Sequence, residues 1–400
     1  GSEMCIRDRG NVPHLRFPEF SGEWETKSIN DLADVIGGGT PDTTVKSYWD
    51  GGIQWFTPSE IGKNKFVDAS LRTITEDGLN NSSAKLLPPN TILLSSRATI
   101  GECSLSLREC ATNQGFQSLV SKKCNVDFLY YLIQTKKKDL IRKSCGSTFL
   151  EISANEVRKI QVSVPSDVEQ QKIAGLLSLI DKRIATQNKI IEDLKKLKSA
   201  IVEMLLCNQN GESFKLRDVG CFVRGLTYAN EDVTENKAAT TVIRANNLNY
   251  GNNVDKDEVV YVNKTPTTSQ ILRKGDIVIC MANGSSSLVG KNSYYPFNDG
   301  QSTIGAFCGI YRTSYPFVKW LMQSQRYKRL VYQSLQGGNG AIANLNGDDI
   351  LNMSFPLIEN GKSQSIIFAI DAIEKSLMVN KSLQRLYYTQ KSYLLKQMFI

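Results

Sequence analysis

Histidine is nearly absent from this 400-residue sequence, because His14 is the only one. Catalytic arrangements that use histidine as a base, and metal sites built from histidine ligands, have no other residue to draw on. This scarcity argues against Ser-His-Asp or Cys-His catalysis and against a histidine metal centre.

Paired cysteines and long apolar runs are also missing. The nine cysteines, at positions 5, 103, 110, 124, 145, 207, 221, 280 and 308, form no Cys-x-x-Cys pair. This argues against structural zinc and against a disulfide framework, and it is typical of a reducing compartment. No apolar run approaches the ~20 residues that span a bilayer, and no signal-peptide pattern opens the chain. We therefore expect a cytoplasmic protein.

Motifs for catalysis or cofactor binding are lacking as well. The stretch from Gly284 to Asn292 has the wrong spacing for a phosphate-binding loop. Glu60 and Lys63 form Glu-x-x-Lys instead of the usual nuclease Glu-x-Lys, and no Asp/Asn-Pro-Pro-Tyr/Phe string of amino-methyltransferases occurs. The sequence predicts no catalytic residue, no metal site and no cofactor in this chain. A formal net charge of +8 permits nucleic-acid binding without establishing it.

The chain does contain an internal repeat. A length of 400 residues exceeds the roughly 250–300 residues that one core supports. Three strings recur with spacings too long for a solenoid, which indicates two tandem copies of one large unit. The pairs are 30–35 with 217–222, 87–94 with 272–279, and 113–116 with 300–303.

Each copy ends in a long segment with helical periodicity. Apolar residues recur at steps of three and four, which keeps them on one helical face. The first stripe is Ile173, Leu177, Ile180, Ile184, Gln187, Ile190, Leu194, Leu197, Ile201 and Leu205. Adding 193 gives Ile366, Ile370, Ile373, Leu377, Asn380, Leu383, Tyr387, Gln390, Leu394 and Met398.

Two such helices, each roughly 55 Å long at 1.5 Å per residue, favour a coiled coil. The alternative is that each helix packs only on its own domain. Gln187 and Asn380 interrupt the two stripes at matching positions. A buried polar pair can fix register in a coiled coil, so we hypothesise that role for them.

The segments before the helices mix short β-type runs with glycine-rich loops and close with short helices, which is typical of compact mixed α/β domains. Tyr48, Trp49 and Trp55 are expected to pack there, with a base-stacking platform as the alternative. The expected organisation is 1–11 as a tag or leader without ordered structure, 12–167 and 208–361 as the two domains, and 168–207 and 362–400 as the helices.

Several strings resemble the specificity (S) subunits of type I restriction-modification systems, over Val12 to Phe399. The second copy diverges, with Arg224–Thr227 and Met281–Ser285 in place of the corresponding loops. The matching strings are Val12–Pro18 with Trp24, Gly38–Pro41, Tyr48–Ile53 with Trp55, Ser95–Gly101, Asn113–Phe116, Gly146–Ser153 and Pro165–Ile173.

The resemblance implies an α+β fold class with two tandem target recognition domains, each followed by a long helix. The helices would pair as an antiparallel coiled coil with pseudo-two-fold symmetry. Each domain would read one half of a bipartite asymmetric DNA site. The helices would set the spacing and dock two methyltransferase (M) subunits, and restriction/translocase (R) subunits would join them. S-adenosylmethionine, ATP and Mg would belong to those partners.

Base edges are read by amides, hydroxyls and arginines, whereas lysines mainly contact phosphates. In the first domain the candidates are Thr40, Thr57, Ser59, Ser96, Arg97, Asn113 and Gln114, with Lys136, Lys137, Lys138, Arg142 and Lys143 for phosphates. In the second they are Arg244, Asn246, Asn247, Asn283, Ser285, Ser286 and Gln301, with Arg326, Lys328 and Arg329 for phosphates.

Two other classes of function stay open at this point. The chain could be a non-catalytic coiled-coil assembly hub with degenerate DNA-binding domains, which would select no split sequence from random duplexes. It could also carry an unrecognised nuclease or methyltransferase activity, which the chain alone would display with Mg²⁺ and a methyl donor.

Overall fold

The computed structural model describes residues 10–146, 150–207, 212–336, 343–357 and 360–400. Most of the expected leader, residues 1–9, lies outside these ranges. The chain divides into two compact units, Gly1–Lys189 with Lys381–Ile400, and Ile190–Asn380. Each long helix contributes to both units, so the predicted domain boundaries stay a prediction. No helix in the described ranges is long and apolar enough to cross a bilayer.

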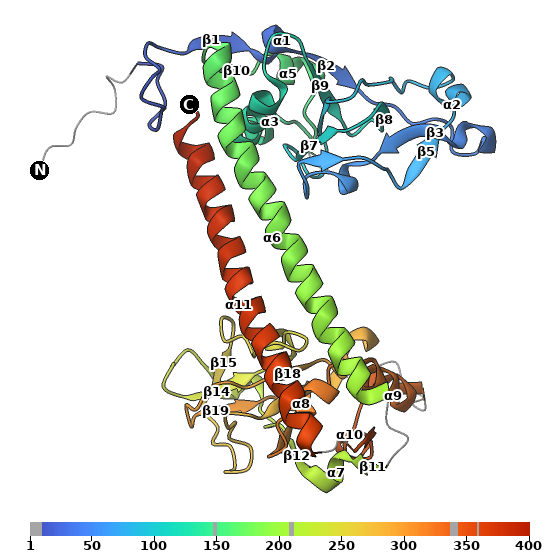
Figure 1. Cartoon of the computed structure of the whole chain (residues 1–400), viewed down its shortest axis with the longest axis vertical. Coiled ribbons are helices and arrows are strands. Elements are labelled where there is room, and N and C mark those ends of the chain that lie inside the picture. Colours follow the sequence, from blue (N-terminus) through green and yellow to red (C-terminus); the bar gives the residue numbers. More distant parts are fainter. Residues whose placement is uncertain (1–9, 147–149, 208–211, 337–342, 358–359) are drawn as a thin grey trace, which may run out of the picture. The chain divides into compact units, whose positions relative to one another are not determined.

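The first unit contains a five-stranded and a three-stranded sheet (Figure 1). Neighbouring strands of the larger sheet are antiparallel except at the β4–β7 edge, and β3 pairs parallel with β8 in the smaller one. The larger sheet has the order β2 (Ala33–Gly37), β9 (Gln117–Ser121), β6 (Ile92–Leu94), β7 (Cys103–Ser106), β4 (Phe66–Val67). The smaller sheet has the order β5 (Arg72–Ile74), β3 (Trp49–Phe56), β8 (Cys110–Thr112). Separately, β1 (Glu25–Ser28) pairs with β10 (Gln161–Val164).

Helix α3 (Val126–Thr135) supplies much of the first core. Its N-cap Asn125 accepts a hydrogen bond from the amide of Phe128 at 3.0 Å, which satisfies one free donor of the first turn. Residues 128–133 are all buried. They share one apolar cluster with residues of β6, β9 and α6. The shorter helices of this unit are α1 (Ile29–Leu32), α2 (Glu76–Asn80), α4 (Lys137–Arg142) and α5 (Ala154–Arg158).

The second unit contains two four-stranded sheets. One sheet has the order β12 (Gly220–Arg224), β20 (Cys308–Thr313), β16 (Ile277–Cys280), β18 (Asn292–Tyr294). The other has the order β13 (Val233–Thr234), β15 (Val260–Val262), β14 (Thr240–Ile243), β19 (Ser302–Ile304). Two-stranded pairs are β11 (Ser213–Lys215) with β22 (Ser354–Pro356), and β17 (Ala282–Asn283) with β21 (Ala343–Asn344). The short helices are α7 (Leu216–Val219), α8 (Val318–Leu321), α9 (Gln325–Gln336) and α10 (Gly347–Leu351).

The two units repeat one topology, as the sequence predicted. The order β2-β9-β6-β7 of the first corresponds to β12-β20-β16-β18 of the second, and the parallel pair β3–β8 corresponds to β14–β19. Val35 pairs with Leu119 where Phe222 pairs with Tyr311, which confirms the first sequence match. The second sequence match, 87–94 with 272–279, is confirmed too. The amide of Leu87 donates to the carbonyl of the first residue of β8, and the amide of Leu272 donates to the carbonyl of the first residue of β19.

The third sequence match is wrong. The amide of Asn113 donates to the carbonyl of Phe56, and in the second unit the amide of Gly305 donates to the carbonyl of Ile243. Asn113 therefore corresponds to Gly305 and not to Gly300. The connections between β16 and β19 are longer than those between β6 and β8, and this insertion shifted the alignment.

The two long helices are confirmed as α6 (Asp167–Cys207, 41 residues) and α11 (Asn360–Gln397, 38 residues). The fold is therefore mixed α/β with two long helices. Of the predicted pairing residues, Ile173, Leu177, Ile180, Ile184, Gln187, Ile370 and Leu377 are buried, and Leu194, Ile366, Ile373, Asn380 and Tyr387 are half-buried.

The predicted stripe on α6 is wrong at two positions, Ile190 and Leu197. Ile190 is 40% and Leu197 50% exposed, whereas Ile191 and Val202 are only 5% and 3% exposed. From Ile173 the buried or half-buried positions now advance 29 residues in eight steps, through 177, 180, 184, 187, 191, 194, 198 and 202, an average close to 3.6. Up to 198 these steps alternate four and three, which is the spacing of a heptad repeat, and only the final step of four departs from it.

Within each unit the two helices contact one another and also the sheets. In the first unit, Ile173 and Leu177 share a cluster with Phe128 of α3 and with Leu394 of α11. In the second, Val202 and Ile370 share a cluster with residues of the sheet. Pairing of the helices as an antiparallel coiled coil stays a prediction. A direct contact between Gln187 and Asn380 stays a prediction.

Candidate functional site

Loops that are far apart in the sequence lie together in the first unit. The amide of Asn113 donates to the carbonyl of Phe56 at 3.1 Å, and the amide of Gly39 donates to the carbonyl of Thr112 at 2.8 Å. These bonds hold the loop after β2, the turn after β3 and the loop after β8 at one edge of the sheets. Two of the strings singled out in the sequence, 38–41 and 113–116, thus lie on one surface with the turn after β3, which is a suitable place for a binding site.

Thr40 and Gln114 meet on this surface. The hydroxyl of Thr40 donates to Oε1 of Gln114 at 2.5 Å, and Gln114 is exposed. The approach of the two loops requires glycine, because a Cβ at Gly38 would lie 2.0 Å from the carbonyl oxygen of Asn113. Both predicted side chains are therefore presented by a closely packed backbone.

Thr57 and Ser59 lie in the neighbouring turn, with their hydroxyl oxygens 3.1 Å apart. The carboxylate of Glu60 fixes the turn, since it accepts hydrogen bonds from the amides of Thr57 at 2.7 Å and Leu71 at 2.6 Å. Glu60 therefore acts as a local cap of this turn.

Arg97 reaches the surface beside these loops. Its guanidinium forms an ion pair with Glu151 at 2.8 Å, and the two side chains are 44% and 38% exposed. Ala98 adopts a left-handed backbone, with φ of +56°, which is uncommon for a residue with a Cβ. The strained turn after Arg97 directs this segment outward, and Glu151 holds the guanidinium in place.

Two predicted base readers are buried. Ser96 has no exposed area, and its hydroxyl has no hydrogen-bond partner in the described residues. Asn247 is 2% exposed, and its Oδ1 accepts from the amide of Arg244 at 2.9 Å. Direct readout needs an exposed polar atom, so base contact by Ser96 or Asn247 is not supported.

The predicted basic run lies at the junction of α3 and α4. Lys136 donates to the main-chain oxygen of Ile400 at 2.7 Å, and burial lowers its pKa. Lys137 pairs with Glu102, whereas Lys138 is exposed.

The other two basic residues follow in the same helix. Arg142 pairs with Asp139 at 2.7 Å, and Lys143 lies 4.0 Å from Glu156. Acidic neighbours thus offset part of the charge, and Lys138 is the best placed of the five for a phosphate.

The second unit brings three predicted readers around one hollow. Arg244, Asn246 and Asn283 line a hollow of about 660 Å³, together with Tyr228 and Phe307. Ser285, Ser286 and Gln301 are exposed but do not line it. This grouping is at the position that corresponds to the loops of the first unit.

The predicted phosphate contacts of the second unit lie on α9. Arg326, Lys328 and Arg329 are all exposed. Arg326 donates to the carbonyl of Ser354 at 2.9 Å, and the ammonium of Lys328 lies 5.1 Å from the centre of the Tyr250 ring. Their cationic groups stay accessible to solvent on one short helix.

The three aromatic residues singled out in the first unit pack internally, as expected. Trp49 and Trp55 are buried with ring centres 5.2 Å apart, and Tyr48 is half-buried beside them. Arg72 stacks on Trp49, 3.5 Å from the ring centre. This arrangement fills the core of the small sheet and leaves no open stacking face on the two buried rings.

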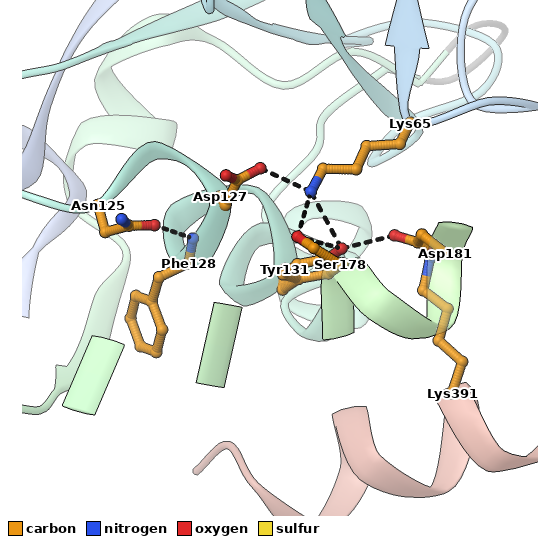
Figure 2. A network of polar contacts seen from close by, with 8 residues as sticks. All are labelled: Lys65, Asn125, Asp127, Phe128, Tyr131, Ser178, Asp181 and Lys391. Carbon is orange, nitrogen blue, oxygen red and sulfur yellow. Dashed lines mark hydrogen bonds and ion pairs between the residues drawn. The ribbon is translucent and has the colours of Figure 1, made fainter. Parts of the chain in front are cut away.

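Figure 2 shows a polar network that the sequence did not reveal. Lys65, with a side chain only 8% exposed, donates to Ser178 at 2.8 Å and Tyr131 at 3.1 Å and pairs with Asp127 at 2.6 Å. It joins a loop of the sheet domain to α3 and α6 in one ion-paired cluster.

The network continues to α11. The hydroxyl of Tyr131 donates to Asp181 at 2.6 Å, and Asp181 pairs with Lys391 at 2.8 Å (Figure 2). Burial, with Asp181 adding to it, raises the pKa of Tyr131. These charges balance in pairs, so the network is best suited to fixing the helices against the domain.

Residues 21–196 match the family model described as the type I restriction modification DNA specificity domain. This stretch belongs to the type I DNA specificity family. The match contains every predicted DNA-contacting residue of the first unit, and the resemblance stated from the sequence is confirmed.

Curated relatives carry the same description. The specificity subunit of the type I restriction enzyme MjaIX from Methanocaldococcus jannaschii is 39% identical over 201 residues, 49% of this chain and 45% of that protein. The EcoR124I/EcoR124II specificity subunit from Escherichia coli is 30% identical over 190 residues, 46% of each. The chain thus covers a little under half of the length of these relatives.

Solved structures extend the likeness in fold to both units. The S subunit of a type I restriction-modification system from M. genitalium has a TM-score of 0.59 at 16% identity, covering 97% of this chain and 99% of that one. A second structure, described under complex assembly and conformational transition of the type I R-M system, has a TM-score of 0.57 at 12% identity, covering 95% and 98%. At these identities the likeness concerns the fold alone.

Proposed function

We propose that this chain is the DNA specificity subunit of a type I restriction-modification complex, and that each unit reads one half of a bipartite asymmetric site. The observation that carries the proposal is the edge formed by the loops of residues 38–41, 57–60 and 113–116, inside the stretch that matches the specificity family. The second unit repeats this topology with different residues, as two different half-sites require.

The chain acts as a reader and not as an enzyme in this proposal. The matched family is named for DNA specificity. The carboxylates at the candidate surface have structural partners, as Glu60 and Glu151 illustrate. Any methyl transfer, with its S-adenosylmethionine, and any ATP- and Mg-dependent cleavage would belong to partner subunits.

The long helices would pair antiparallel, set the spacing between the half-sites and dock two M subunits, which R subunits would join. Contacts inside each unit support the pairing, namely Asp181 with Lys391 and Lys198 with Glu374. Exposed large apolar residues on α11, such as Phe368 and Val379 in the second unit, suit a docking surface. The proposed location of this complex is the cytoplasm.

Selection from random duplex DNA tests the proposal. The full chain, alone and with its M subunit, is incubated with a random pool at fixed salt, and the bound DNA is sequenced. We expect enrichment of two short conserved blocks separated by unread bases. Binding without such enrichment would favour the assembly-hub alternative.

A further inference from the structure

An aromatic side chain in the second unit is exposed to an unusual degree at the candidate surface. Phe307 is 70% exposed and lies in the turn between β19 and β20. Its carbonyl accepts hydrogen bonds from the amides of Met281 at 2.8 Å and Ala282 at 3.3 Å. The backbone is therefore fixed, and the phenyl ring is presented to solvent from a firm base.

The equivalent position of the first unit carries no ring. There the amide of Ser96 donates to the carbonyl of Gly115, just as the amide of Met281 donates to the carbonyl of Phe307. The hydrogen bonds thus place Phe307 where the first unit has Gly115. A ring in one unit and a hydrogen atom in the other is a large chemical difference between two otherwise equivalent loops.

The neighbours of Phe307 have the chemistry of a major-groove reader. Arg244, Asn246 and Asn283 line the same hollow of about 660 Å³. Arginine suits guanine, asparagine suits adenine, and an apolar side chain suits the methyl group of thymine. The hollow therefore holds donors and amides for base edges beside one apolar surface.

We infer that Phe307 is a specificity-determining residue of the second unit and that its ring contacts the methyl group of a thymine in the second half-site. The inference rests on the proposed function. It explains the exposure of the ring, since the apolar contact that the free protein lacks would be made with DNA. It also gives the second unit a preference for an A·T pair at one position, which Gly115 cannot give the first.

The test removes the same methyl group from the DNA and the ring from the protein. The split site selected by the full chain is synthesised with deoxyuridine in place of each thymine of the second half, one at a time. At one position we expect affinity to fall about fourfold, the value for loss of one buried methyl-sized contact. With F307A the same replacement has no effect, while the preference in the first half-site is unchanged.

The control is Y332A, which removes another exposed aromatic side chain of this unit, 64% exposed on α9 and outside the hollow. It keeps the deoxyuridine effect. Thermal unfolding checks that F307A folds, which the exposure of Phe307 favours. Three outcomes would overturn the inference and leave the proposed function standing. They are an equal deoxyuridine effect in F307A, no deoxyuridine effect at any position, and a second half-site without an A·T pair. Failure of the wild-type chain to select a split site would instead remove the proposed function, and the inference with it.

Discussion

Arg97 lies on the candidate surface of the first unit with its guanidinium held by Glu151. If it makes a bidentate contact with guanine, R97A costs about 1–3 kcal/mol and relaxes one position of the first half-site only. Selection from random duplexes measures this directly. R108A is the matched control, because Arg108 forms a similar exposed ion pair with Asp68. Relaxation in both halves, or in neither, would contradict the assignment.

Lys138 is exposed on α4 and, unlike Lys137 and Arg142, forms no ion pair among the described residues. A phosphate contact is independent of sequence, so K138A weakens binding to all duplexes equally and lowers the slope of log affinity against log salt by about one. K137A has a smaller effect because Glu102 already pairs with Lys137. Titrations at several salt concentrations with selected and scrambled duplexes measure both. A loss confined to the selected duplex would rule out phosphate contact.

At this scale the sequence located the surface better than the individual contacts. Thr40, Asn113 and Gln114, which the sequence singled out as candidates, lie close together in the structure. Ser96 and Asn247 do not qualify, because a polar residue type does not reveal whether its loop turns inward. The Lys65 network was missed for a related reason, since Lys65, Ser178 and Lys391 lie more than a hundred positions apart in the sequence.

The buried face of α6 passes through Ile191 and not through Ile190. Ile191 is 5% and Ile190 40% exposed, although the two residues are identical in kind and adjacent. I191A therefore lowers the free energy of unfolding by about 2–5 kcal/mol, and I190A costs much less. Chemical denaturation of the two variants makes the comparison. A larger loss for I190A would instead support the stripe through Ile190 that the sequence predicted.

The elements themselves were largely predictable. Periodicity gave both long helices, and two of the three sequence matches gave the correct strand equivalences. The third sequence match failed because the second unit has extra residues between β16 and β19, and these led to Gln301 being aligned with Gln114. The stripe on α6 failed at two positions because isoleucine occupies both 190 and 191, and because the half-buried position 198 carries a lysine while its apolar neighbour Leu197 is exposed.

At the scale of the whole molecule, helix length is proposed to set the number of unread bases. Four residues of helix correspond to about 6 Å, and base pairs are stacked about 3.4 Å apart. Deleting four residues from α6 and four from α11 thus changes the gap by one or two base pairs. Sequencing of selected duplexes reads the gap. An unchanged gap in a folded variant would show that the helices do not set it.

The central claim is that one chain carries two similar readers with different preferences. Long-read methylation mapping of DNA from cells that express this chain with its M subunit tests it most directly. The account predicts one motif of two unlike blocks with a fixed gap, methylated at adenine in each block. A continuous motif, a symmetric motif, or no methylation that depends on this chain would contradict it.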